Sequence, residues 1–301
     1  MFKEYIFDIA DWKVRICFAN EDAITSMKLL PSFETFLNIE TEKERSELYS
    51  MYVDQKLKFT REDQCTFIKD CETPNGIVSV SELKEGGYQF TINRYDGKLC
   101  ALMLSNDDND LFRIKVFGET KQQRQFGLNN AMMMAYAFAG ACHGTLLIHA
   151  SLIRKDGIGY AFIAKSGTGK STQTGNWLKM IPECDLMNDD NPVVRMVDGK
   201  AMIYGSPWSG KTPCYRQVKA PLGAVSLISR DTTNWVEKVS PIKAFKELIS
   251  SCSAMKWDKK TFRGVCDTVS AVVASTGNYT LHCTKEPESA IVCYEGIKVK
   301  G

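Results

Sequence analysis

Short apolar runs separated by polar turns predict that the chain up to about residue 118 is built of β-strands. The runs contain alternating or β-branched apolar residues, and clusters of Asn, Asp and Gly at 95–98 and 106–110 are typical of turns. The expected strands cover 13–18, 50–59, 76–80, 87–94, 98–104 and 111–117. This half therefore indicates a β-rich, largely antiparallel domain, in which no motif points to a function.

After residue 118 the pattern changes to helices that alternate with apolar strands, which is typical of an α/β fold. A helix is expected over 128–142 and another from Lys170. Strands are expected over 145–154, 159–164, 192–197, 200–204, 222–229 and 279–283, with further helices over 242–251, 258–276 and 287–294. We therefore predict two domains, a β-rich one over 1–122 and an α/β one over 123–301.

Composition and charge narrow the class of partner. The 301 residues are 44% hydrophobic and 25% charged, which is ordinary for a compact globular protein, and the net charge is only +2. Such a balance gives no electrostatic reason to expect a nucleic acid or an anionic membrane as partner. Asp8 and Asp11 interrupt the apolar start that a secretory signal would need, so we expect a cytoplasmic protein.

Two other features have an ordinary structural interpretation. The apolar stretch 131–150 is long enough to span a membrane, but His143, Gly144 and His149 interrupt it, which favours a buried helix followed by a buried strand. The 11 cysteines contain no Cys-x-x-Cys pair. They are therefore expected as reduced, packed thiols rather than as a zinc site or a disulfide framework.

The strongest motif lies at 161–172, where the apolar strand AFIA runs into the loop KSGTG and the helix start KST. Backbone N–H groups converge on a phosphate chain in this context, and glycines let the backbone approach it. Lys170 would neutralise the β- and γ-phosphate oxygens, and the Ser171 hydroxyl would ligate Mg²⁺. Ala164 stands where the consensus has glycine. ATP and Mg²⁺ are the expected ligands, and the predicted nucleotide-binding residues are Ser166, Gly167, Thr168, Gly169, Lys170, Ser171 and Thr172.

A second motif, LMNDDNP at 186–192, begins 15 residues after Ser171 and carries the adjacent acids Asp189 and Asp190. We expect it on a parallel strand that returns beside the strand before the loop. One carboxylate could then hold the Mg²⁺ shell while the other accepts a proton from an acceptor hydroxyl. An exposed turn rich in Asn and Asp is the alternative interpretation of the same residues.

The order His149, SGTGKST at 166–172 and NDDN at 188–191 resembles the catalytic core of HPr kinase/phosphorylase, which shares its fold with phosphoenolpyruvate carboxykinase. The resemblance covers roughly residues 143–230. It implies a mixed-sheet P-loop kinase core behind the β-rich N-terminal half. It also implies that Asp189 is the proton-accepting aspartate, that Asp190 is its magnesium-associated neighbour, and that His149 orients the base.

The segment 202–211, MIYGSPWSGK, lacks the carboxylate of the family's acidic signature strand, so regulated phosphorolysis of a carrier protein is not expected. It resembles instead the uncharacterised HPr-kinase-like proteins of similar length. Ser209, Gly210 and Lys211 form a second loop of small residues with a cation, and Arg216 follows. We predict that Lys211 and Arg216 face the paired acids and hold the transferred phosphoryl group or an anionic acceptor.

The sequence thus predicts an ATP- and Mg²⁺-dependent kinase whose acceptor is the hydroxyl of a small molecule, a peptide or a protein serine. Its predicted catalytic residues are His149, Lys170, Asp189 and Lys211, its metal residues Ser171 and Asp190, and its phosphate or substrate residues Lys211 and Arg216. The alternative is a catalytically silent module that senses a nucleotide or binds a peptide. The resembling family often forms rings, so a homo-oligomer is compatible with the sequence, and no residue pattern fixes its stoichiometry.

Overall fold

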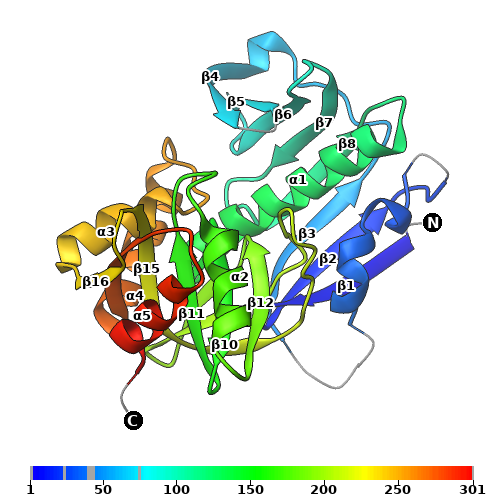
Figure 1. Cartoon of the computed structure of the whole chain (residues 1–301). Coiled ribbons are helices and arrows are strands. Elements are labelled where there is room, and N and C mark those ends of the chain that lie inside the picture. The colour runs from blue at the N-terminus through cyan, green and yellow to red at the C-terminus, as the bar shows by residue number, and fades with distance from the viewer. Residues whose placement is uncertain (1–2, 23–24, 39–44, 74–75, 300–301) are drawn as a thin grey trace. The chain divides into compact units, whose positions relative to one another are not determined.

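The computed structural model describes residues 3–22, 25–38, 45–73 and 76–299 (Figure 1). The chain divides into two compact units, Met1–Ala139 and Gly140–Gly301. The division falls near the end of helix α1 (Lys121–Ala141), whereas the sequence predicted a boundary after residue 122, near the start of this helix. The physical reason is that α1 packs on the first unit: the Tyr136 hydroxyl donates to the Ile9 carbonyl (3.1 Å), and the Tyr49 hydroxyl donates to the Met132 carbonyl (3.2 Å).

The first unit is built on a sheet of eight strands in the order β1-β2-β3-β8-β7-β6-β5-β4. Neighbours are antiparallel except for β3, which runs parallel to both β2 and β8. The strands are β1 (Lys3–Ile9), β2 (Trp12–Phe18), β3 (Glu47–Val53), β4 (Cys65–Thr73), β5 (Gly76–Leu83), β6 (Tyr88–Arg94), β7 (Leu99–Ser105) and β8 (Leu111–Val116). The unit also contains three short 3₁₀ helices, η1 (Met27–Leu29), η2 (Pro31–Phe36) and η3 (Glu62–Gln64). The predicted β-rich half is therefore confirmed, while β1 and β4 are additional strands.

The apolar stretch at 131–150 forms the second half of α1, a turn, and strand β9 (Thr145–Leu147). Gly144 adopts a left-handed conformation at this turn, with φ +60°, which a residue with a side chain rarely adopts. Within the described parts of the chain, the structure contains no helix with the length and apolar character needed to cross a membrane. The prediction of a buried helix that turns into a buried strand is confirmed, but the strand expected over 145–154 is split into β9 and β10 (Ala150–Lys155), which pair with different strands.

The second unit is built on a nine-stranded mixed sheet (Figure 1). Its main order is β12-β10-β11-β15-β14-β13-β9, and β17 pairs with β15 and with β16. The other strands are β10 (Ala150–Lys155), β11 (Ile158–Ile163), β12 (Cys184–Asp190), β13 (Val193–Val197), β14 (Lys200–Tyr204), β15 (Lys219–Arg230), β16 (Trp235–Lys238) and β17 (Gly277–Cys283). Strands β11, β15 and β17 are parallel, and the remaining pairs are antiparallel. The fold of this unit is therefore α/β, as predicted.

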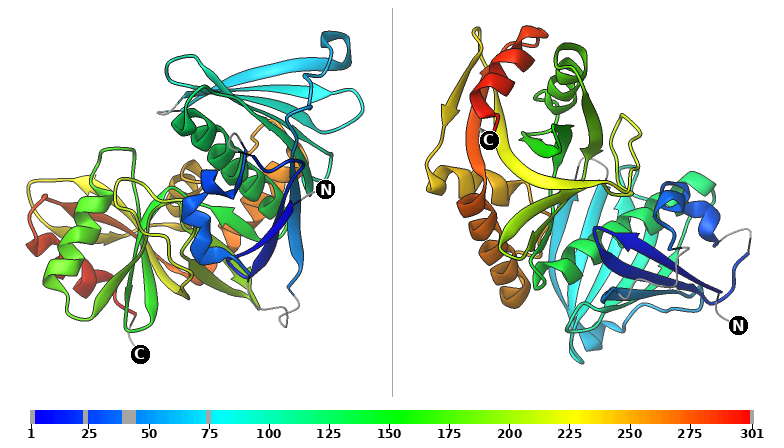
Figure 2. Two further views of the ribbon diagram at one scale, coloured as in Figure 1. Left: turned by 90° about the vertical axis from the view of Figure 1, so that its right-hand side faces the viewer. Right: turned by 90° about the horizontal axis from the view of Figure 1, so that it is seen from below.

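Helices cover both faces of this sheet (Figures 1 and 2). Because both faces of the central strands are buried, the sequences of these strands are almost continuously apolar. Helices α2 (Lys170–Met180) and α5 (Glu288–Ile297) pack on one face, where Trp177 is fully buried against the rings of Tyr160 and Phe162. Helices α3 (Pro241–Ser250) and α4 (Lys259–Ser275) pack on the other. The Asp258 carboxylate caps α4 by accepting a hydrogen bond from the Thr261 N–H (2.6 Å).

Candidate functional site

The glycine-rich loop, residues 164–169, connects the central strand β11 to the start of α2. Gly167 and Gly169 have φ of +77° and +133°, so both positions favour glycine and shape the loop. No side chain caps the N-terminus of α2 at Gly169. The first N–H groups of a helix have no intrahelical partner, so this end presents donors and a positive dipole to an anion. The loop therefore has the local structure that the sequence predicted for a phosphate site.

Lys170 begins α2 with its side chain folded under the loop, where it is 8% exposed. Its Nζ lies 3.2 Å from the Ala164 carbonyl oxygen and 2.7 Å from Nε2 of His149. Burial lowers the pKa of the Lys170 ammonium, and the charges of Asp190 and Asp189 oppose that shift. An ammonium group only donates hydrogen bonds, so charged Lys170 requires Nε2 of His149 to be the acceptor.

His149 links Lys170 to the paired acids. Its Nδ1 lies 2.9 Å from Oδ1 of Asp190, so the ring proton that Nε2 lacks faces this carboxylate. Asp190 ends β12 with φ +135°. This backbone conformation is energetically unfavourable for any residue other than glycine. Its second oxygen accepts a hydrogen bond from the side-chain amide of Asn191 (2.8 Å). A carboxylate, an imidazole and an ammonium are thus arranged in series beside the loop.

Asp189 is 2% exposed and accepts hydrogen bonds from two hydroxyls. Oγ of Ser171 lies 2.9 Å and 3.2 Å from its two oxygens, and Oγ of Ser151 donates to Oδ1. Strand β10 lies between β11 and β12 and is antiparallel to both, so β12 runs in the same direction as β11 but is not its neighbour. The expectation that the acidic strand returns directly beside β11 is therefore wrong. The intervening strand supplies Ser151, which is opposite Asp189 in the register.

A second loop, residues 205–214, crosses the end of β12. Fully buried Asn188 holds it by donating from Nδ2 to the Trp208 carbonyl (3.1 Å) and to Oγ of Ser206 (3.2 Å). Oγ of Ser209 donates to the Asp189 carbonyl (3.0 Å), and the Gly210 N–H donates to the same oxygen. A Cβ on Gly210 would lie 3.1 Å from Cβ of Asp190, tighter than most contacts, so glycine permits this close approach. The structure therefore brings the predicted small-residue loop to the paired acids.

The two predicted cations of this segment have different surroundings. Lys211 is exposed beside Gly210, and within the described residues its ammonium has no hydrogen bond or ion pair. Nη1 of Arg216 lies 2.6 Å from Oδ2 of Asp185 and also donates to the Leu186 carbonyl. Between Lys211 and Arg216 the chain runs from the end of β12 back toward its start. The contact of the Cys214 thiol with the Leu186 carbonyl (3.6 Å) shows this direction. Arg216 is therefore at the opposite end of β12, and the prediction that it faces Asp189 and Asp190 is not met.

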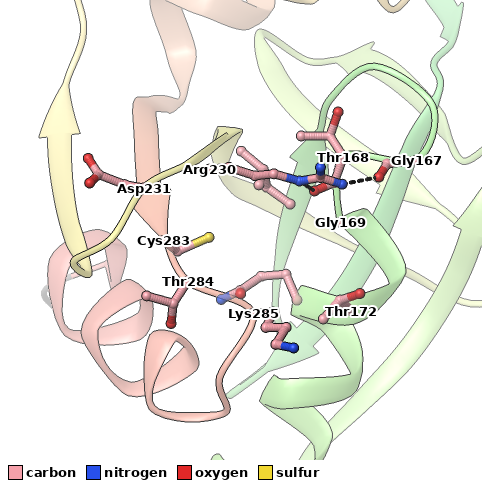
Figure 3. A pocket seen from close by; sticks show the side chains of 11 residues that line it. Gly167, Thr168, Gly169, Thr172, Arg230, Asp231, Cys283, Thr284 and Lys285 are labelled. Atoms are coloured by element: carbon pink, nitrogen blue, oxygen red, sulfur yellow. Dashed lines mark hydrogen bonds between the residues drawn. The ribbon is translucent and has the colours of Figure 1, made fainter.

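The structure adds two site residues that the motifs did not identify. Ser151 is one, and the sole signal for it was a hydroxyl within the apolar strand 145–154. Arg230, at the end of β15, is the other: its Nε and Nη2 donate to the carbonyls of Thr168 (3.1 Å) and Gly167 (2.5 Å), as Figure 3 shows. Nothing in the sequence near Arg230 indicates this contact, because it depends on β15 lying beside β11.

The sequence matches no known family model and no curated protein. What the site can bind is therefore inferred from its own residues and their contacts. It combines an uncapped helix start, a buried lysine, two adjacent carboxylates, and hydroxyls that link one carboxylate to the loop. Such a set is suited to bind a polyphosphate together with a cation.

Proposed function

We propose that the second unit is an ATP- and Mg²⁺-dependent phosphotransferase of the HPr kinase/phosphorylase type, which transfers the γ-phosphoryl group to a hydroxyl acceptor. The observation that carries the proposal is the 2.9 Å hydrogen bond from Oγ of Ser171 to the Asp189 carboxylate. It joins the phosphate-binding loop to the paired acids, which are 18 residues away in sequence. A chance glycine-rich turn would not need this partnership.

In this proposal the glycine-rich loop binds the triphosphate. Its glycines and the free N–H groups of the first turn of α2 surround the place where phosphate oxygens bind. Lys170 already lies beneath it with a pKa lowered by burial, so an arriving phosphate gives this ammonium a charged partner. Exposed Lys211 adds a cation on the side of the acids for the transferred group or an anionic acceptor.

The donor set fits Mg²⁺, since Ser171, Asp189 and Asp190 offer a hydroxyl and carboxylate oxygens. Magnesium prefers oxygen ligands and is typically held by one or two carboxylates together with substrate phosphates and water. When bound, it neutralises the charge that develops on the phosphate oxygens. In the described parts of the chain, no three His, Cys, Asp or Glu side chains gather as a metal site of their own, so the proposed cation would need phosphate oxygens and water to complete its shell.

The hydrogen bonds favour a division of roles between the acids that reverses the one implied by the resemblance. Asp189 is buried and bonded to Ser171, as a group of the metal shell would be. The Asp190 side chain is 34% exposed and reachable by an acceptor hydroxyl. We therefore assign proton acceptance to Asp190 and metal association to Asp189. His149 acts as the positioning residue that fixes Asp190 and Lys170.

The test compares Lys170→Ala with Lys179→Ala, a matched change at an exposed lysine of the same helix. Calorimetry with Mg²⁺ and a non-hydrolysable ATP analogue measures binding. Transfer from γ-labelled ATP to water and to a panel of serine peptides and small alcohols measures activity. Lys170→Ala should weaken binding by about tenfold or more, because it removes a charge-assisted contact to phosphate. Lys179→Ala should match the wild-type protein.

Two results would contradict the proposal in different ways. Wild-type affinity in Lys170→Ala would remove the phosphate-binding role of the loop. Binding without any release or transfer of the labelled phosphoryl group would favour the alternative, a module that senses the nucleotide without reacting with it.

A further inference from the structure

A cavity of about 700 Å³ lies in the first unit, the part of the chain in which no motif points to a function. We call it the η1 cavity, because η1 and the residues before it line it together with β1 and the start of α1. The Tyr5 hydroxyl joins two of these segments by donating to the Glu21 carboxylate (3.0 Å). The volume lies within the range of roughly 300–1,000 Å³ that is usual for sites of small organic ligands.

The two carboxylates of the η1 cavity already have partners in the chain. Glu21 accepts a hydrogen bond from the Met27 N–H (3.0 Å) and forms an ion pair with Lys3 (2.6 Å). Burial alone would raise the pKa of this carboxyl group, but the bonds from Lys3, Met27 and Tyr5 outweigh it and lower the pKa. Oδ1 of Asp22 accepts a hydrogen bond from a backbone N–H three residues further on (2.8 Å). Glu21 and Lys3 therefore offset each other's charge.

The three other cations of the cavity have no carboxylate partner within the described chain. Lys28 and Lys121 are exposed, and neither ammonium has a hydrogen bond or an ion pair with another described residue. Nη1 of Arg124 donates to the carbonyls of Gly118 (2.8 Å) and Glu119 (3.1 Å). Carbonyl groups have no net charge, so they orient the guanidinium without neutralising it. Four cations and two carboxylates line the cavity, which leaves an excess of two positive charges.

Side chains, and not the N–H groups of the helix start, supply the donors for an anion. Oε1 of Gln123 accepts hydrogen bonds from the N–H groups of Glu119 and Thr120 (2.8 Å and 3.2 Å), and Oγ1 of Thr120 accepts one from the Gln123 N–H (3.3 Å). These N–H groups are therefore occupied. The 21-residue helix still adds the positive end of its dipole to the charges of Lys121 and Arg124.

Apolar surface lies beside these charges. Leu29 is buried, and Met27 and Tyr5 are half-buried in the lining of the cavity. The Tyr5 ring is held by an edge-on contact with the Phe18 ring (centroids 6.0 Å apart) and by its hydrogen bonds to Glu21. A matching ligand therefore combines about two negative charges with a compact apolar body.

We propose that the η1 cavity binds a small organic dianion, either a dicarboxylate or a phosphate monoester. Its charged groups pair with Lys28, Lys121 and Arg124, since ammonium and guanidinium groups form charge-assisted hydrogen bonds with both kinds of anion. Its apolar part lies against Tyr5 and Leu29. The inference does not depend on the proposed kinase, because every residue in it belongs to the first unit.

The test measures the binding of three probes to the full chain by calorimetry: isophthalate, phenyl phosphate, and isophthalamide, the neutral counterpart of isophthalate. At least one dianion should bind with a Kd of about 1 mM or lower, and isophthalamide should bind at least about tenfold more weakly than isophthalate. Whichever dianion binds more tightly distinguishes a carboxylate ligand from a phosphate ester. Its affinity should fall as the salt concentration rises, because exposed charges are screened.

The variants change exposed lysines, and thermal unfolding checks that they fold. Lys28→Gln and Lys121→Gln should each weaken the tighter dianion by about threefold, and the double variant by about tenfold. Lys58→Gln, at an exposed lysine of the same unit outside the cavity, should match the wild-type protein. Lys170→Ala, in the glycine-rich loop, should also bind this dianion with wild-type affinity.

Four results would overturn the inference. They are the absence of binding of both dianions at about 10 mM, equal affinity for isophthalate and isophthalamide, wild-type affinity in the double lysine variant, and a loss of dianion binding in Lys170→Ala. The last result would mean that the dianion occupies the glycine-rich loop. Failure of the ATP analogue to bind the wild-type protein would contradict the proposed function and leave this inference intact.

Discussion

Strand β12 carries carboxylates near both of its ends, and the fold surrounds these two ends differently. Near its start, Asp185 receives two hydrogen bonds of 2.9 Å from Arg154 and one of 2.6 Å from Arg216. At its end, Asp189 and Asp190 receive hydrogen bonds from hydroxyls, an amide and an imidazole. Two arginines offset the charge of the first carboxylate, whereas no arginine contacts the second pair within the described residues.

The difference shows which carboxylates are available for chemistry. Burial alone would raise the pKa of Asp185, but hydrogen bonds from Arg154 and Arg216 outweigh it and lower the pKa. A carboxylate whose oxygens are held by two arginines and whose pKa is lowered is poorly suited to accept a proton or to bind a metal. Asp189 and Asp190 have no arginine partner in the part of the chain that the structure describes, and the charge that interacts with them is the Lys170 ammonium. The Mg²⁺ ion that we propose would add a second counter-charge.

The largest effect should come from separating the roles of the two acids. Asp190→Asn should lower kcat by about 10²-fold or more with little change in nucleotide affinity, because a general base typically contributes 10²–10⁴. Asp189→Asn should instead raise the Mg²⁺ concentration needed for half-maximal rate. Steady-state kinetics over a Mg²⁺ series, with calorimetry for the nucleotide, measures both effects.

The control for this pair is Asp198→Asn, a change at an exposed turn of the same unit where φ is +49° and Asn is tolerated. It should leave both parameters unchanged. The opposite pattern, with kcat lost in Asp189→Asn and a changed Mg²⁺ requirement in Asp190→Asn, would restore the assignment that the family resemblance implies.

A smaller effect should follow from Ser151→Ala, which removes one of the two hydroxyls on Asp189. A hydrogen bond to a charged group contributes about 1.5–3 kcal/mol, so kcat/KM at limiting Mg²⁺ should fall by about tenfold or more. A merely structural serine would change the unfolding midpoint and not the Mg²⁺ dependence. The matched control is Ser226→Ala, another fully buried serine, whose hydroxyl has no hydrogen bond within the described residues.

Much of the fold could be predicted because it depends on local patterns. The helices beginning at Lys170 and near 242, 258 and 287, and most strands of both units, follow from apolar periodicity and turn residues, while β1, β4 and β16 were not predicted. The edge strand β4 was missed because its side chains are mostly exposed and give no alternation. The unit boundary was placed too early because the contacts of α1 with Ile9 and Tyr49 are long-range and leave no trace in the helix itself.

The site could be predicted only as far as its motifs reach. The loop, the acids and His149 lie together because three short segments end at one edge of the sheet. Strand order decided the rest: β10 inserts Ser151 next to Asp189, and β15 brings Arg230 to the loop. Arg216 was assigned to the wrong end of β12 because its direction depends on how the 205–214 loop folds back, which residue spacing does not encode.

The smallest expected effect concerns Asp185, the carboxylate near the start of β12 that two arginines hold. Asp185→Asn removes the charge between Arg154 and Arg216 and should lower the free energy of unfolding at pH 7 by about 1 kcal/mol or less, since such partly exposed pairs are screened by solvent. The folded pKa of Asp185 is lowered, so its contribution is present above the unfolded value of about 4 and is lost as pH falls through the folded value. The thermal midpoint of the variant should therefore lie at most about 2–4 °C below wild type at pH 7 and should converge with it in acid. Asp198→Asn should follow the wild-type curve throughout. A gap that widens toward acid would mean that Asp185 is protonated in the folded state, and the contrast between the two ends of β12 would then rest on packing and not on charge.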